Sequence, residues 1–438
     1  MKPKGVLGEP MADATLLEVT GLAVRRGTQD VFTDFDLAIS SGQSILLHGE
    51  NGAGKTTLIE AIAGLLPLHA GDISRARPYG LALQHGGFHG DEIVHERIEA
   101  AASLAGVDAA GVDAILERWG LTHRRADRIA HLSGGMQRRI GLIQALLPAY
   151  ADAAPRLILL DEPSEGLDQA GMAVLSRDVR ALAARGHAFL IASHDARLDE
   201  IATHTLDLAD PTLRASDAAT GEIAEDVPCL AAGETRMRDA ETWMRLDRRT
   251  HASLVVRGLP FLAALITISG LTSALDLSRL PTSLAGGLVM LPAFLAALPP
   301  HTSLRLAREN RSGDWWRAMG GCDSAPEPFS AILLLLGPWV AALVLGLATV
   351  QDWHWLGYGL AMMCVNLAAG AIGTLVERLP RQQAAFGTLL NLILLWPFLI
   401  LADGISMDPI WQPMLVAGLP PLIIAFAMPL LHPRTGSD

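Results

Sequence analysis

A glycine-rich loop between a short apolar strand and a helix most constrains the fold of this chain. A strand is predicted over Ser44–Leu47, the loop runs from Gly49 to Thr56, and a helical pattern follows over Thr57–Leu66. Glycines let backbone N–H groups wrap around phosphates, and the N-terminus of the helix adds the positive end of its dipole. The pattern GxxxxGK[ST] in this context therefore predicts an α/β domain that binds nucleotide phosphates.

Each residue of this loop has an expected contact with the nucleotide. Lys55 is expected to reach the β- and γ-phosphates, and the Thr56 hydroxyl is expected to ligate Mg²⁺. The residues predicted to bind the nucleotide here are Gly49, Asn51, Gly52, Ala53, Gly54, Lys55, Thr56 and Thr57.

Two further motifs follow in the soluble half. The apolar run Leu157–Glu162 predicts a buried parallel strand that ends in two carboxylates. Asp161 would hold Mg²⁺ through water, and Glu162 would orient and polarise the attacking water. The sequence Leu132-Ser133-Gly134-Gly135 opens a predicted helix with a good N-cap and exposed N–H groups, a second anion-binding device. Because the domain already has one phosphate loop, this second device is expected to face the nucleotide of a partner copy.

The order of these motifs, continued by Gly166-Leu167-Asp168 and Ser193-His194-Asp195, resembles the nucleotide-binding domain of ABC transporters over residues 16–205. The resemblance implies an α/β P-loop fold with an antiparallel β subdomain and a helical subdomain, using ATP and Mg²⁺. It further implies that Gln84 is a catalytic and Mg²⁺-ligating Q-loop residue, Asp168 the D-loop residue, and His194 the switch histidine. Ser133, Gly134 and Gly135 would then bind ATP across a dimer.

The antiparallel subdomain carries one departure from the family pattern. Alternation of apolar and polar residues predicts strands over Leu16–Val24 and Phe35–Ile39. ABC ATPases usually place an aromatic residue just before the glycine of the first hairpin, to stack on adenine. Here Arg26 precedes Gly27, and it is either a guanidinium that stacks on the base or a solvated hairpin arginine.

Composition divides the chain into two halves. Most of the net charge of −12 lies in the first half, which argues against binding to nucleic acid. Residues 258–431 carry few charges and contain six apolar stretches of the length a bilayer requires, so we expect an all-α six-helix transmembrane domain. The stretches are 258–275, 282–300, 328–350, 356–376, 384–402 and 413–431.

The remaining segments complete the expected organisation. Residues 1–15 are predicted to be an extension, 206–242 a linker, and 432–438 a tail. Residues 243–257 are expected to form a cytosolic interfacial helix, with a soluble surface helix as the alternative. Arginines concentrate in the loops on the side of the N-terminus, and no signal peptide opens the chain, so we expect an inner-membrane protein with its ATPase domain and both termini in the cytoplasm. The three isolated cysteines predict neither a disulfide framework nor a metal site.

The longest loop on the cytosolic side, His301–Pro328, contains a charged and aromatic stretch around Trp315 and Trp316. An ATPase can drive transport only if its closure is passed mechanically to the membrane helices. We expect this loop to lie against the ATPase domain near Gln84 and to couple the two halves; the alternative is a plain solvated loop.

The organisation resembles the haem exporter of cytochrome c maturation, with its ATP-binding and membrane subunits fused. A single phosphate loop and a single LSGG motif per chain imply a homodimer. The expected function is ATP-driven export of a hydrophobic or amphipathic substrate, haem being one candidate, with the lipid bilayer and accessory membrane proteins as further partners. The alternative is an ABC complex that uses ATP for mechanotransmission or regulation without moving cargo.

Overall fold

The computed structural model describes residues 14–50, 52–90, 92–151, 154–209, 212–216, 227–233, 259, 262–267, 311–319, 364, 368, 400 and 411–430. The chain divides into two compact units. The first comprises Met1–Thr242, Ala307–Asp323 and Arg434–Asp438, and the second comprises Trp243–Leu306 and Ser324–Pro433.

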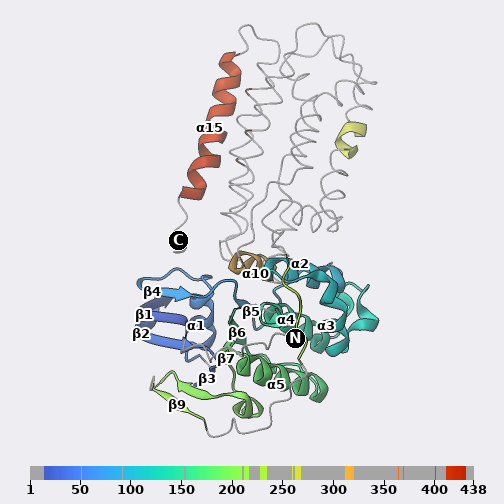
Figure 1. The fold of residues 1–438 in the computed structure, drawn as a ribbon. Coiled ribbons are helices and arrows are strands. Elements are labelled where there is room, and N and C mark those ends of the chain that lie inside the picture. The colour runs from blue at the N-terminus through green and yellow to red at the C-terminus, as the bar shows by residue number, and fades with distance from the viewer. Residues whose placement is uncertain are drawn as a thin grey trace, which may run out of the picture. The chain divides into compact units, whose positions relative to one another are not determined.

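The first unit contains two sheets (Figure 1). A three-stranded antiparallel sheet has the order β2-β1-β4, and a six-stranded sheet has the order β5-β6-β7-β3-β8-β9. The strands are β1 (Thr15–Arg26), β2 (Gln29–Ser40), β3 (Ser44–His48), β4 (Ala70–Arg75), β5 (Gly80–Ala82), β6 (Leu157–Asp161), β7 (Ala188–Ala192), β8 (His204–Asp207) and β9 (Leu213–Ala215).

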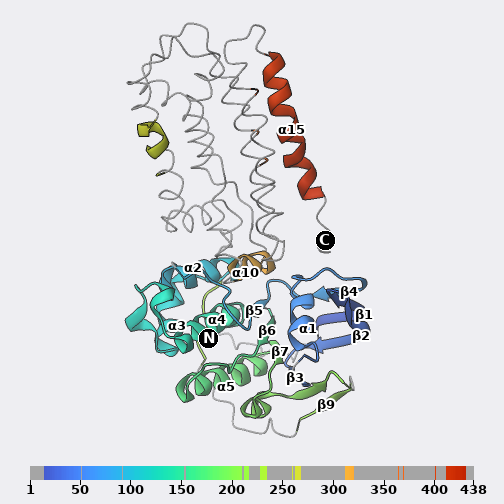
Figure 2. The same cartoon turned by 180° about the vertical axis from the view of Figure 1, so that it is seen from behind.

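The helices of the first unit pack around these sheets, as Figure 2 shows from the opposite side. The α-helices are α1 (Lys55–Ile62), α2 (Val94–Ala105), α3 (Val112–Arg118), α4 (Gly134–Tyr150), α5 (Gln169–Ala184) and α10 (Ser312–Ala318). Short 3₁₀ helices are η1 (Ala109–Gly111), η2 (Thr122–Arg124), η3 (Ile129–His131) and η4 (Ala196–Ile201).

The six-stranded sheet forms the core that positions the site. Every residue of β6 and of β7 is buried, as expected of central parallel strands covered on both faces. Strands β5, β6, β7, β3 and β8 run parallel, so the loops that follow them leave the same edge of the sheet. Only β9 pairs antiparallel in this sheet, against β8.

Most predicted elements of this unit are found, with boundaries that differ. The predicted strands over Leu16–Val24 and Phe35–Ile39 lie within β1 and β2. The helix after the phosphate loop was expected to reach Leu66 but ends at Ile62, because Gly64 takes a left-handed conformation with φ 76°. Within the predicted linker 206–242, β9 joins the sheet, and Leu230 donates a backbone hydrogen bond to Tyr150.

The described part of the second unit is small. Its longest helix is α15 (Trp411–Leu430), at the position of the sixth predicted apolar stretch, and residues 262–267 are also helical. Among the described residues, no helix has the length and apolar character needed to cross a membrane. Most of the predicted extension, the interfacial helix, the tail and nearly all of the other apolar stretches lie outside the described residues.

Candidate functional site

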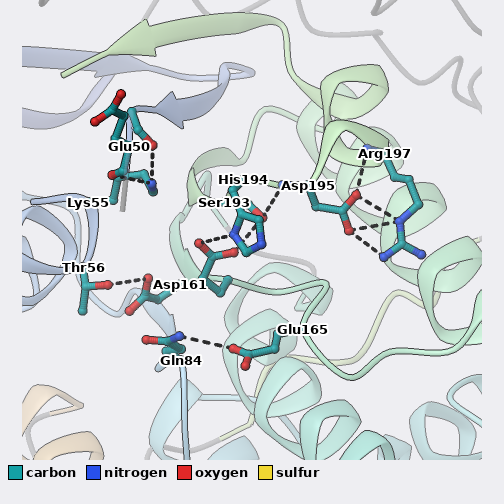
Figure 3. A network of polar contacts seen from close by, with 12 residues as sticks. Glu50, Lys55, Thr56, Gln84, Asp161, Glu165, Ser193, His194, Asp195 and Arg197 are labelled. Atoms are coloured by element: carbon teal, nitrogen blue, oxygen red, sulfur yellow. Dashed lines mark hydrogen bonds and ion pairs between the residues drawn. The ribbon is translucent and has the colours of Figure 1, made fainter. Parts of the chain in front are cut away.

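The predicted catalytic residues gather at the carboxyl edge of the six-stranded sheet (Figure 3). The phosphate loop follows β3, and Gln84 follows β5. Asp161 ends β6, Glu162 comes directly after it, and His194 follows β7. The parallel arrangement of these strands brings together residues that are far apart in the sequence, at the edge where α/β proteins bind their ligands.

The phosphate loop closes around its lysine. The Lys55 ammonium donates to the carbonyls of Gly49 at 2.6 Å and Glu50 at 3.3 Å, and its side chain is almost buried. Gly54 has φ 101°, and a Cβ added there would meet Val31 at 2.7 Å, so the β1–β2 hairpin lies directly against the loop. Gly52 also takes a positive φ, which glycine adopts readily. Asn51 lies outside the described residues.

Thr56 and Asp161 form a pair of oxygen donors suited to Mg²⁺. The Thr56 hydroxyl donates to Asp161 Oδ1 at 3.1 Å. Asp161 Oδ2 is buried and has no hydrogen-bond partner within the part of the chain that the structure describes. Burial raises the pKa of Asp161 to about 6, because the anionic carboxylate is poorly solvated. A buried carboxylate oxygen left unpaired beside a hydroxyl fits a hard divalent cation.

Glu162 lies at the centre of the polar network. Its backbone takes the left-handed conformation with φ 46°, which is uncommon for a residue with a side chain. Its carboxylate accepts from the Ser193 hydroxyl at 2.9 Å and lies 3.1 Å from His194 Nδ1. The strained backbone and the two polar partners fix the direction of this carboxylate, as expected of a general base.

His194 is the exposed member of this network. Its side chain is 69% exposed, so it is open to a ligand from solvent. The hydrogen bond and the charge of Glu162 raise its pKa above the ordinary value for histidine. The next residue, Asp195, accepts a hydrogen bond from Arg197 at 2.6 Å, which lowers the aspartate pKa and anchors the loop after β7.

Gln84 extends toward a different carboxylate. Its amide donates to Glu165 Oε2 at 3.3 Å. The structure thus places the predicted Q-loop residue beside the segment that follows Glu162, at the same edge as Thr56 and Asp161. Its expected role as a Mg²⁺ ligand stays a prediction.

Arg138 joins several parts of this edge and was not predicted from the sequence. It is buried in α4, and its guanidinium donates to carbonyls after β5 and at the end of β6, including Leu83 at 2.6 Å and Asp161 at 2.5 Å. Burial lowers its pKa to about 10. The sequence could not indicate this role, because the partners of Arg138 are backbone carbonyls, which every residue carries.

The LSGG segment begins α4 and packs against the segment that follows β6. Ser133 caps α4, and its hydroxyl accepts from the Met136 N–H at 3.4 Å. Ser133 and Gly134 are exposed, while a Cβ at Gly135 would meet the Gly166 carbonyl at 2.7 Å. Arg139, six residues after Ser133, holds Asp168 at 2.6 Å and so ties the D-loop to α4.

Arg26 has a partner that the sequence did not indicate. Its guanidinium pairs with Glu60 of α1, whose side chain is 5% exposed, while the Arg26 side chain itself remains 49% exposed. Neither alternative considered from the sequence included this partner, because Glu60 lies 34 residues away.

Helix α10 belongs to the first unit and lies beside α2 in Figures 1 and 2; the buried surface on which it packs is called its seat below. Trp315 and Trp316 are buried, and the Trp315 indole N–H donates to the Leu81 carbonyl at 3.0 Å. The Arg97 guanidinium of α2 lies 4.1 Å from the ring centroid of Trp315 and 4.8 Å from that of Trp316, close enough for cation–π attraction.

Further contacts hold both sides of this seat. Arg97 also donates to the Gly87 carbonyl at 2.7 Å and to Gln144 at 3.0 Å. The Tyr79 hydroxyl lies 2.8 Å from the Ala318 carbonyl at the end of α10. These contacts place α10 against the segment that begins at Gln84, as predicted for the loop His301–Pro328.

Comparisons with known proteins agree with this geometry. A family model described as ABC transporter matches residues 32–165. The zinc import ATP-binding protein ZnuC of Alkalilimnicola ehrlichii is 36% identical over 207 residues, covering 44% of this chain and 74% of that protein. The cytochrome c biogenesis ATP-binding export protein CcmA of Cereibacter sphaeroides is 36% identical over 212 residues, covering 48% of this chain and 96% of that protein.

A solved structure described as an ATP-binding subunit of an ABC transporter is 25% identical, covers 46% of this chain and 91% of that chain, and has a TM-score of 0.43. From the family model and the sequence relatives, the chain belongs to the ABC transporter family of ATP-binding proteins. It is an ATPase whose activity is coupled to transport. The predicted ABC-type P-loop fold of the N-terminal part is thereby confirmed.

Proposed function

We propose that this chain is one half of an ATP-hydrolysing exporter that works as a homodimer and moves a hydrophobic or amphipathic cargo, haem being the leading candidate, out of the cytosol or the inner leaflet. One observation carries the proposal. Residues Ala307–Asp323 belong to the ATPase unit, while the chain on both sides of them belongs to the second unit.

This arrangement supports a coupling role for α10. The helix is held by buried tryptophans and a buried arginine, and such an anchor transmits displacement better than a solvated loop does. The apolar second half, with its arginines placed on one side, supports the six-span membrane domain of an inner-membrane protein. Closure of the ATPase units would then move the chain on both sides of α10.

The ATPase steps follow from the site. Lys55 would bind the terminal phosphates, and Thr56 and Asp161 would hold Mg²⁺, which neutralises charge on the phosphate oxygens when bound. Glu162 would orient and polarise the attacking water, and His194, exposed beside it, would contact the γ-phosphate.

The exposure of the LSGG segment supports the proposed homodimer. Ser133 and Gly134 are exposed, and the contacts that hold this segment run toward Gly166 and Asp168 rather than toward Lys55. A second copy would therefore supply Ser133 and Gly135 to each ATP, and two ATP molecules would be enclosed per dimer.

Export of a haem-type cargo rests on the wider match to the export protein. CcmA is matched over 96% of its length, against 74% for ZnuC, at the same 36% identity. Lipid and accessory membrane proteins remain proposed partners.

The test measures ATP hydrolysis by the full chain in liposomes, with haem or Zn²⁺ added separately. We expect haem to stimulate hydrolysis and Zn²⁺ to leave it unchanged, with Glu162→Gln inactive in both conditions. Stimulation by Zn²⁺ alone would contradict the cargo and favour import. Hydrolysis that neither probe changes, without ATP-dependent accumulation of haem inside the vesicles, would favour the mechanotransmitting alternative.

A further inference from the structure

One buried carboxylate is shared by arginines from two distant parts of the chain. Glu60 of α1 accepts from Arg311 through Oε1 at 2.7 Å, and its other oxygen, Oε2, pairs with Arg26. A buried carboxylate is costly unless it is paired, so these two partners together fix where Glu60 points. Glu60 thereby links the end of β1 to the start of α10.

The first partner lies beside the phosphate loop. Arg26 ends β1, and the hairpin that follows places Val31 and Phe32 against Gly54, so Arg26 is carried by the element that packs on the loop. Half of its side chain is exposed, and its planar guanidinium can stack on the base of a bound nucleotide. Glu60 itself lies five residues after Lys55, on the helix that the phosphate loop opens.

The second partner begins α10. Arg311 takes the left-handed conformation with φ 53°, and its carbonyl accepts from the Trp315 N–H at 3.1 Å. Its side chain is held by Glu60 and, at 3.0 Å, by Asp314. A residue with a side chain persists in this conformation when its surroundings stabilise it. Among the described residues, the carboxylates of Glu60 and Asp314 stabilise Arg311.

We propose that Glu60 is a positioning residue through which the seating of α10 increases the affinity for ATP. Arg311 pairs with one oxygen of Glu60, and this orients the other oxygen toward Arg26. The Arg26 guanidinium is thereby held in the position from which it would stack on the base of ATP. This inference rests on the proposed coupling role of α10. By linkage, a nucleotide that engages Arg26 strengthens the hold on α10 by the same factor.

The experiment is a double-mutant cycle. Steady-state ATP hydrolysis by the full chain is measured without added cargo for Arg26→Gln, Arg311→Gln and the double variant. Arg26→Gln should raise the KM for ATP about tenfold with little change in kcat, because a base contact is lost. Arg311→Gln should raise KM about threefold, as expected for one partly exposed ion pair, but only while Arg26 is present. The double variant should therefore match Arg26→Gln alone.

The matched control is Arg25→Gln, which removes the neighbouring arginine that pairs with Asp30 rather than Glu60, and its KM should equal that of the unmodified chain. Effects of Arg26→Gln and Arg311→Gln that multiply would overturn the proposal. In Glu60→Gln, Arg311→Gln should no longer change KM, and a persistent threefold effect would also overturn it; if Glu60→Gln does not fold, the arginine cycle decides alone. Because no cargo is used, a failure of haem to stimulate hydrolysis leaves this test intact.

Discussion

Two regions of the molecule are built on opposite principles. One is the carboxyl edge of the six-stranded sheet, where Glu162 and His194 lie, called the hydrolysis edge here; the other is the seat of α10. At the hydrolysis edge, polar groups lie on loops at strand ends, and His194 keeps 69% of its side chain open to solvent. At the seat of α10, Trp315 and Arg97 are each only 1% exposed. Chemistry on ATP needs access for the ligand, whereas a mechanical anchor needs the exclusion of water. Substitutions at the edge should therefore change rates, and substitutions in the seat should change stability.

The largest expected effect is on the rate at the hydrolysis edge. Glu162→Gln should lower kcat by about 10²–10⁴-fold while the variant still binds ATP, because the amide cannot act as a base and has nearly the same shape. Phosphate release and nucleotide binding are measured on the same preparation. The exposed α3 carboxylate offers the control Glu117→Gln, which should match the unmodified chain. Hydrolysis by Glu162→Gln at the normal rate would remove Glu162 from the site.

The next largest expected effect is a loss of stability when the seat of α10 is disrupted. Trp315→Ala should lower the free energy of unfolding by about 3–5 kcal/mol, since it opens a cavity and removes the nearer of the two aromatic rings that contact the buried Arg97. Denaturant unfolding checks the value. Trp411→Ala, which removes a tryptophan that is 56% exposed at the start of α15, should cost far less. Equal losses in both variants would mean that α10 is not anchored by burial.

A third prediction uses the two ends of β7, where one histidine is open and the other is buried. His187, just before the strand, has a pKa lowered to about 4 by burial and by the charges of Arg156 and Arg185. The folded state therefore resists protonation at His187, and the stability it contributes is present above about pH 6.5 and lost as the pH falls through 4. This loss should reach about 3 kcal/mol.

The variant His187→Asn keeps an acceptor for the Arg156 N–H, which now bonds to His187 Nδ1 at 3.1 Å. Urea unfolding at pH 7 and pH 4 should show that the variant loses less stability on acidification than the unmodified chain. The control His123→Asn changes an exposed histidine in η2 and should retain the full pH dependence. An unchanged pH dependence in His187→Asn would assign the acid sensitivity to other groups.

The hydrolysis edge could be predicted from the sequence because its signals are local. Each motif joins a strand end to a loop within a few residues, as in Ser44–Thr56 or Leu157–Glu162, and the parallel sheet then brings the motifs together. Even there, the end of α1 was placed four residues too late, because the sequence pattern alone did not reveal that Gly64 turns the chain.

The seat and the links between the regions could be predicted only in outline. An aromatic, charged loop suggested a contact with the ATPase domain, but the partner of Trp315 is Arg97, more than 200 residues earlier. The sequence did not indicate that Arg26 pairs with Glu60, and whether it also stacks on the base stays a prediction. Arg138 bonds to carbonyls, which every residue carries. Such pairings depend on tertiary packing, which motif spacing does not encode.

The central claim is that ATP bound at the hydrolysis edge stabilises the packing of α10. Hydrogen–deuterium exchange of residues 311–319 tests it in full-length Glu162→Gln, which should hold ATP without turnover. The N–H groups of Trp315 and Met319 bond within the helix, so their exchange reports how firmly α10 is seated. ATP with Mg²⁺ should slow this exchange about fivefold or more, the lower bound of a typical coupling between sites. Protection of the phosphate loop by ATP with no change in residues 311–319 would contradict the account.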